Sequence, residues 1–201
     1  MLYLILIMAK NLVSLLLLLL CNFSYAQVTA TIKWETGNKR NAGDTILYNP
    51  DKKLNWNDFR GRPDKNSRAA AITESGFGYR LAMQYSSTGK ASIVITVVCF
   101  FNKTGSWVKP GMASDYALTH EQHHFDLTYI AACAFVEKLK AARFTVENCA
   151  SLLEKINDEC YRDLDKMQND YDGETRNGQL RNIQFAWNKK IDLQLENLFT
   201  N

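Results

Sequence analysis

The sequence predicts an α+β domain in which a small antiparallel sheet is followed by three helices. Two observations predict it: period-two and β-branched apolar segments fill residues 77–101, whereas apolar residues recur every three or four positions after residue 114. The composition, 46% hydrophobic and 22% charged, is that of an ordinary globular domain. It excludes a disordered or low-complexity chain.

The strands are expected in the first half of the chain. A short apolar run at 45–48 and the alternating segment 77–85 each predict a strand. The segment 91–101 is apolar on both faces and rich in β-branched residues, which predicts a buried central strand. Residues 86–90 contain a glycine and predict a hairpin loop between the last two strands. The rest of residues 27–68 is polar and is expected to be irregular.

The helices are expected in the second half of the chain. Ser114 is a suitable N-cap for the first helix, and a second helix is expected to start after Thr145. The apolar stripe of the second helix runs to Met167, and Gly173 is expected to break that helix. The third helix is expected to begin near Asn177, with Asn177 as its N-cap.

The first 26 residues predict a secretory signal peptide. Lys10 is their only charged residue, residues 12–20 are almost purely aliphatic, and small side chains precede position 27. The aliphatic run is short for a membrane anchor, which needs about 20 apolar residues. Cys21 leaves a lipoprotein signal as a minor alternative. We therefore expect an exported protein, periplasmic or extracellular, with one domain over residues 27–201 and no stable membrane span after cleavage.

Four cysteines remain after that cleavage, namely Cys99, Cys133, Cys149 and Cys160. An even number in an oxidising compartment allows disulfide bridges, but buried thiols are an equal alternative. Cys149 and Cys160 lie on one predicted helix, about 16 Å apart along its axis. A bridge between these two is therefore excluded, because the Cα atoms of a disulfide lie within about 7 Å.

The segment with the clearest chemical content is His120-Glu121-Gln122-His123-His124, which holds all three histidines of the chain. It contains the H-E-x-x-H pattern. On a helix, His120 and His124 project from one face, one turn apart, so both rings can bind one Zn²⁺. Glu121 is rotated by about 100° from His120 and can approach a water molecule instead of the metal. His123 points elsewhere and is expected at the surface or behind the site.

This pattern predicts a zinc-dependent peptidase. Zinc lowers the pKa of a bound water to about 7 and polarises a carbonyl, while Glu121 acts as general base in the attack on a peptide bond. The expected partner is a peptide or protein substrate. A net charge of +3 with interspersed signs gives no reason to expect a nucleic-acid partner. The alternative is that the pattern is a chance occurrence on a structural helix.

A third metal ligand is expected to be a carboxylate, because His123 points elsewhere and the chain has no further histidine. If the first two helices form an antiparallel pair that turns near Arg143, residues 120–124 lie level with the second helix beyond residue 160. The acids in that region are Asp163, Asp165, Asp170, Asp172 and Glu174. We favour Asp172 as the ligand, and Glu174 after it.

Several segments together resemble a known family. They are Leu54-Asn55-Trp56-Asn57-Asp58-Phe59-Arg60-Gly61, Ala69-Ala70-Ala71-Ile72-Thr73, Ser106-Trp107, the histidine segment through Phe125-Asp126, Tyr171-Asp172-Gly173-Glu174-Thr175, Gln184 and Trp187. Their order over residues 45–195 resembles the bacterial domain-of-unknown-function family 922, described as predicted secreted zinc-dependent proteases. The resemblance implies a zincin-like fold with the active site on the first long helix.

One position departs from that family. Relatives tend to carry His-Gly where this chain has Asn177-Gly178. If the family histidine is a metal ligand, this chain has lost it and depends on a carboxylate instead. The departure supports an alternative function, a non-catalytic envelope binding protein of the same fold with a degenerate metal site.

Overall fold

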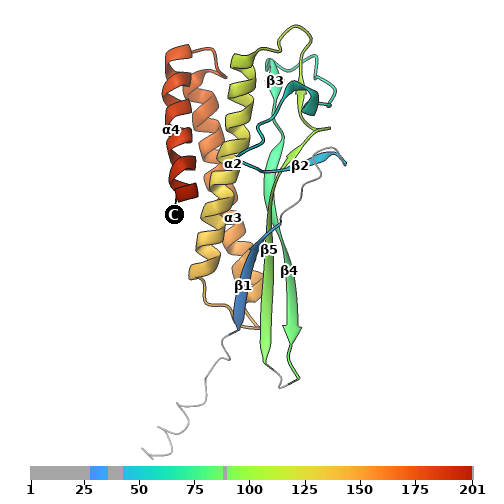
Figure 1. The fold of residues 1–201 in the computed structure, drawn as a ribbon, viewed down its shortest axis with the longest axis vertical. Coiled ribbons are helices and arrows are strands. Elements are labelled where there is room, and N and C mark those ends of the chain that lie inside the picture. Colours follow the sequence, from blue (N-terminus) through green and yellow to red (C-terminus); the bar gives the residue numbers. More distant parts are fainter. Residues whose placement is uncertain (1–27, 36–42, 88–89, 201) are drawn as a thin grey trace, which may run out of the picture.

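A computed structural model describes residues 28–35, 43–87 and 90–200. It confirms the α+β class, with a small sheet packed against three long helices (Figure 1). The predicted signal peptide lies outside the described residues and stays a prediction. In chain order the elements are β1 Thr29–Trp34, β2 Thr45–Leu47, η1 Trp56–Asp58, β3 Ala71–Ile72, β4 Ser75–Tyr85, β5 Ala91–Asn102, β6 Trp107–Val108, α2 Asp115–Ala141, α3 Cys149–Thr175 and α4 Arg181–Thr200.

The main sheet is mixed, not antiparallel as predicted. β4 pairs with one edge of the central strand β5, in antiparallel register from Ser75↔Phe101 to Tyr85↔Ala91. The other edge of β5 pairs first with β1, in parallel, and then with β2, antiparallel. The sequence interpretation missed β1 because half of its side chains are exposed and polar, as its Thr-Ala-Thr-Ile-Lys-Trp sequence shows. A second, two-stranded sheet pairs β3 with β6.

The core lies between one face of the main sheet and the helices. Alternate residues of β5, from Ile93 to Phe101, are buried, and they belong to one cluster with Phe135 of α2 and Leu153 of α3. β5 is the central strand, as predicted, but only one of its faces is fully buried, because the helices cover only one face of the sheet. α4 packs on the far side of α2 and α3, where a smaller cluster forms around Trp187.

The three helices lie where the sequence predicts them, but the end of α3 and the start of α4 differ from the prediction. Ser114 caps α2, and its side chain accepts a hydrogen bond from a backbone N–H three residues later, at 3.1 Å. α3 does not break at Gly173 but continues to Thr175, because buried packing of its last turn outweighs a glycine cost of about 1 kcal/mol. Asn177 is not an N-cap: it lies in the connecting turn with φ 52°, and α4 begins at Arg181. None of the helices in the described ranges has the length and apolar content to cross a membrane.

The four cysteines in the described part of the chain are unpaired. Cys99, Cys149 and Cys160 are buried and pack as small apolar side chains, while Cys133 is half-buried. Burial raises the pKa of the Cys99 thiol well above its ordinary value, which makes it a poor nucleophile. Of the two alternatives that the sequence left open, the structure has the free thiols.

Candidate metal centre

The antiparallel pairing of α2 and α3 places the histidine segment opposite the end of α3. Lys138, near the end of α2, lies 3.6 Å from the Asp163 carboxylate, whereas His120, near its start, lies 3.1 Å from the Asp172 carboxylate. The pairing predicted from the short connection is therefore confirmed. Because the helices run in opposite directions, the acid that faces His120 is nine residues beyond the one that faces Lys138.

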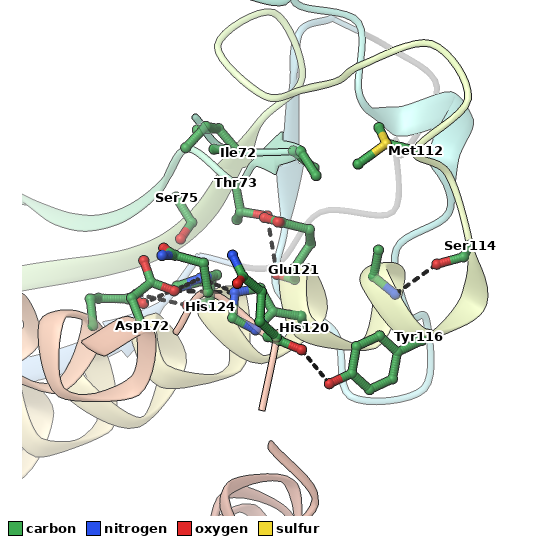
Figure 2. A pocket seen from close by; sticks show the side chains of 18 of the residues that line it. Ile72, Thr73, Ser75, Met112, Ser114, Tyr116, His120, Glu121, His124 and Asp172 are labelled. Atoms are coloured by element: carbon green, nitrogen blue, oxygen red, sulfur yellow. Dashed lines mark hydrogen bonds and ion pairs between the residues drawn. The ribbon is translucent and has the colours of Figure 1, made fainter. Parts of the chain in front are cut away.

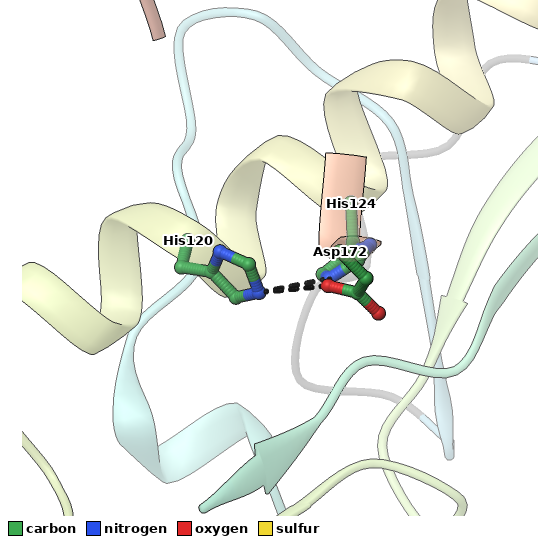
Figure 3. A group of neighbouring side chains, drawn as sticks. All are labelled: His120, His124 and Asp172. Carbon is green, nitrogen blue, oxygen red and sulfur yellow. Dashed lines mark hydrogen bonds and ion pairs between the residues drawn. The ribbon is translucent and has the colours of Figure 1, made fainter. Parts of the chain in front are cut away.

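Three side-chain atoms form a nearly equilateral triangle at this point (Figure 3). Asp172 Oδ1 lies 3.1 Å from Nε2 of His120 and 3.1 Å from Nε2 of His124, and the two Nε2 atoms are 3.2 Å apart. In a tetrahedral zinc site with bonds of about 2.0–2.1 Å, neighbouring ligand atoms lie about 3.3 Å apart. The triangle therefore fits three ligands of one zinc ion.

Two glutamines set the proton positions on the imidazoles. Gln168 Nε2 donates to the His124 carbonyl oxygen at 2.9 Å, so its Oε1 faces His124 Nδ1 and requires a proton there. Gln184 Nε2 donates to the hydroxyl of Tyr171, and its Oε1 faces His120 Nδ1 at 2.8 Å. Both rings thus carry Nδ1–H and present an Nε2 lone pair to the triangle, which is the form that binds a metal.

The electrostatics of the triangle favour a positive charge at its centre. Burial raises the pKa of Asp172, but the imidazoles of His120 and His124 beside it outweigh burial and hold its pKa below the usual range. Burial lowers the pKa of His124, but Asp172 and Glu121 outweigh that effect and raise it. Two nitrogens and one carboxylate oxygen are ligands that zinc prefers, and the residues present therefore fit the ion.

Glu121 lies beside the triangle without joining it. Its carboxylate oxygen Oε2 accepts a hydrogen bond of 2.7 Å from the hydroxyl of Thr73, in the connection between β3 and β4 (Figure 2). Thr73 also lies 3.1 Å from the Glu121 carbonyl oxygen. This connection therefore fixes the carboxylate of Glu121, the general base that the sequence predicts, on the face of α2 that turns toward the sheet.

The triangle and Glu121 open into a cleft of about 490 Å³. The cleft runs along α2 and α3 beneath the segment that leads into β4. No lysine or arginine is among its described lining residues, which are Ala69, Ala70, Ala71, Ile72, Thr73, Ser75, Met112, Ser114, Tyr116, Ala117, His120, Glu121, His124, Tyr161, Leu164, Asp165, Gln168, Asp172, Asn177, Gly178 and Gln179.

The other candidates from the sequence lie elsewhere. Glu174 faces α4, where its carboxylate accepts a hydrogen bond of 2.8 Å from Trp187 Nε1. His123 is buried, 3.3 Å from the carboxylate of Asp192. Of its two expected positions, at the surface or behind the site, the surface is excluded, because α4 covers that face of α2. Asn177 lines the cleft but is outside the ligand triangle.

Gln122 and Asp126 belong to the opposite side of α2. Gln122 Oε1 accepts the backbone N–H of Leu54 at 2.7 Å, and its Nε2 donates to Asp126 at 2.9 Å. Asp126 is fully buried and also accepts a hydrogen bond from the Tyr48 hydroxyl at 2.7 Å. These bonds attach the segment before η1 to the helix, so the glutamine in the histidine segment has a structural role.

The sequence interpretation did not assign a role to Thr73, Gln168 or Gln184. Gln168 had a signal, because it lies one turn before Asp172 and therefore on the same face of the same helix. Thr73 had none, because its distance from Glu121 depends on how the small β3–β6 sheet sits on α2. Gln184 became recognisable only once α4 was known to cover the site.

Comparisons with protein-family models, with curated proteins and with solved structures found no match to this chain. The resemblance described above therefore stays a prediction.

Proposed function

We propose that this chain is a zinc-dependent peptidase in which His120, His124 and Asp172 hold the metal and Glu121 is the general base. The observation that carries the proposal is the triangle of ligand atoms with sides of 3.1–3.2 Å, directly beside a buried carboxylate. A structural histidine pair would not need both Nε2 atoms to converge on one carboxylate oxygen.

The chain supplies the parts for peptide hydrolysis. Zinc bound by the triangle would act as a Lewis acid toward a carbonyl and would lower the pKa of water. Thr73 holds Oε2 of Glu121, which leaves Oε1 for accepting a proton from the attacking water and passing it to the departing amine. With zinc bound at Nε2, His120 and His124 would be neutral ligands whose remaining protons lie on Nδ1, where Gln184 and Gln168 accept them.

The shape of the cleft supports an extended peptide as the substrate. β3 has one hydrogen-bonded neighbour among the described strands, β6, so its other edge is available to a further strand. Residues 69–73 line the cleft above Glu121. An extended peptide that adds to this edge would pass over the triangle with its backbone fixed by main-chain hydrogen bonds.

The proposed setting is the periplasm or the extracellular space, on the strength of residues 1–26, which are outside the described ranges. The alternative, a non-catalytic envelope binding protein, rests on Asn177. That residue lines the cleft, but the triangle is complete without it.

The test is zinc content together with cleavage. The purified protein should hold one zinc per chain by elemental analysis, and it should cleave a peptide mixture in a manner that a chelator abolishes and added zinc restores. A His124→Ala variant should have neither property. Stoichiometric zinc without any cleavage would overturn the peptidase proposal in favour of the binding protein. Absence of zinc from the protein would also overturn it, and would favour a binding protein with a degenerate metal site.

A further inference from the structure

We propose that Asp165 makes the cleft selective for peptides that carry a cationic side chain, lysine or arginine, close to the scissile bond. The inference rests on the proposed peptidase function and specifies its substrate class. Asp165 lies on α3 at the end of the cleft away from Tyr116, and it is exposed to solvent in the cleft wall.

The position of Asp165 follows from the helix that carries the third ligand. Asp165, Gln168 and Asp172 are spaced by three and four residues, so they lie along one face of α3. Two turns of helix separate Asp165 from Asp172, about 10 Å along the axis. That distance equals about three residues of extended chain, so a side chain at one of the first three positions beside the scissile bond can reach Asp165.

The charge of the cleft points to a cation. Its charged lining residues are Glu121, Asp165 and Asp172, with no described lysine or arginine among them. A zinc ion with two neutral imidazoles offsets the negative charges of Asp172 and Glu121. Asp165 then remains as the one charged lining residue that the ion does not offset, and no ion pair involves it in the described part of the chain. An incoming cation would therefore find a partner there, whereas an acidic side chain would be repelled.

The surroundings of Asp165 also suit a long side chain. Leu164 is buried in the wall, and the half-buried ring of Tyr161 stacks on Phe77 with ring centroids 4.5 Å apart. The Tyr161 hydroxyl donates to the Phe77 carbonyl oxygen, which fixes the ring in place. A lysine or arginine can lay its methylene groups on such a wall and present its charged end to a carboxylate.

The experiment compares three sets of fluorescence-quenched peptides that differ at the positions flanking one cleavable bond: arginine, alanine or glutamate. The zinc-loaded protein should cleave the arginine peptides with a higher kcat/KM than the alanine peptides, and the glutamate peptides least. Asp165→Asn should lose about fivefold in kcat/KM on the arginine peptides, the size expected for a solvent-exposed ion pair, and change little on the alanine peptides. Asp165→Lys should reverse the order of arginine and glutamate.

Asp163→Asn is the matched control, because Asp163 lies on the same helix, is 71% exposed and is outside the cleft lining. It should keep the wild-type preference. Equal cleavage of the three sets by the wild type, or a preference that survives in Asp165→Asn, would overturn the inference while leaving the peptidase intact. If no set is cleaved, the peptidase proposal fails. In that case, fluorescence anisotropy measures how tightly the zinc-loaded Glu121→Gln variant binds the three sets of peptides. Tighter binding of the arginine peptides would show that Asp165 still selects a cationic ligand, and equal binding would overturn that selectivity as well.

Discussion

Gln168 contacts His124 at two points, accepting the Nδ1 proton of the imidazole with Oε1 and donating from Nε2 to the backbone carbonyl at 2.9 Å. Because the carbonyl can only accept, the orientation of the amide is fixed, and with it the tautomer of the ring. A glutamine on α3 thus determines which nitrogen of a histidine on α2 is available to a metal.

Gln168→Leu should therefore weaken zinc binding by about 10–100-fold, the usual effect of losing a partner that orients a ligand. Competition with a chromophoric chelator measures this affinity. Gln194→Leu is the control, since Gln194 is exposed on α4. Equal zinc affinity in the Gln168 and Gln194 variants would contradict the assigned tautomer.

Asp172→Ala should lose zinc, whereas Glu174→Ala should keep it. Asp172 Oδ1 is within 3.1 Å of both imidazoles, but Glu174 faces Trp187 on α4. The Glu174 variant should lose only the hydrogen bond to Trp187, about 1 kcal/mol in the free energy of unfolding. Elemental analysis and denaturant titration distinguish the two. If only the Glu174 variant lost zinc, Glu174 and not Asp172 would be the third ligand.

Glu121→Gln should retain zinc and lower kcat by at least about 100-fold, because the amide cannot accept the proton of the attacking water. Zinc content and turnover are measured on the same preparation. Wild-type turnover in this variant would exclude Glu121 as the general base.

Thr73→Val should reduce kcat by about tenfold with unchanged zinc content. The hydroxyl of Thr73 donates to Glu121 Oε2 at 2.7 Å, and hydrogen bonds to charged groups contribute about 1.5–3 kcal/mol. Thr73→Ser keeps the hydroxyl and should restore most of the loss. A serine variant as slow as the valine variant would indicate a packing role for Thr73 instead of a positioning role.

Gly178→Ala and Gly173→Ala should have opposite effects on stability. Gly178 has φ 77°, and a Cβ there would lie 3.4 Å from His120 Nδ1, so alanine should cost about 1–2 kcal/mol and disturb the ligand. Gly173 lies within α3, where a Cβ meets nothing within 4 Å. Alanine there should stabilise the protein by about 0.5–1 kcal/mol. Thermal unfolding of the two variants tests this, and a stabilised Gly178→Ala would contradict the described turn.

The parts of the site that lie on one helix, or on two helices joined by a short turn, were predictable from the sequence. His120 and His124 follow from helical spacing, and Asp172 follows from the reversal of direction near Arg143. In contrast, Thr73 depends on the pairing of two-residue strands, whose signal in the sequence is too short to recognise.

In the fold as well, pairings between neighbouring segments were predictable from the sequence, whereas pairings between distant segments were not. The hairpin of β4 and β5 was predictable because the strands are adjacent and their loop contains a glycine. The parallel partner of β5 was not, because β1 is separated from it by more than fifty residues and exposes alternate side chains. The run of α3 through Gly173 was also missed, since it depends on packing around the buried Tyr171.

The start of β1 lies at the end of the domain away from the candidate metal centre. The backbone N–H of Val28 donates to the carbonyl oxygen of Phe144, in the connection after α2. His120 lies near the opposite end of that 27-residue helix, about 30 Å from its last turn. A leader, lipid tether or purification tag joined ahead of Val28 would thus be attached near the C-terminal end of α2, whereas the cleft lies near the N-terminal end of that helix. The cleft of a tethered copy would therefore lie at the other end of the domain from the attachment point.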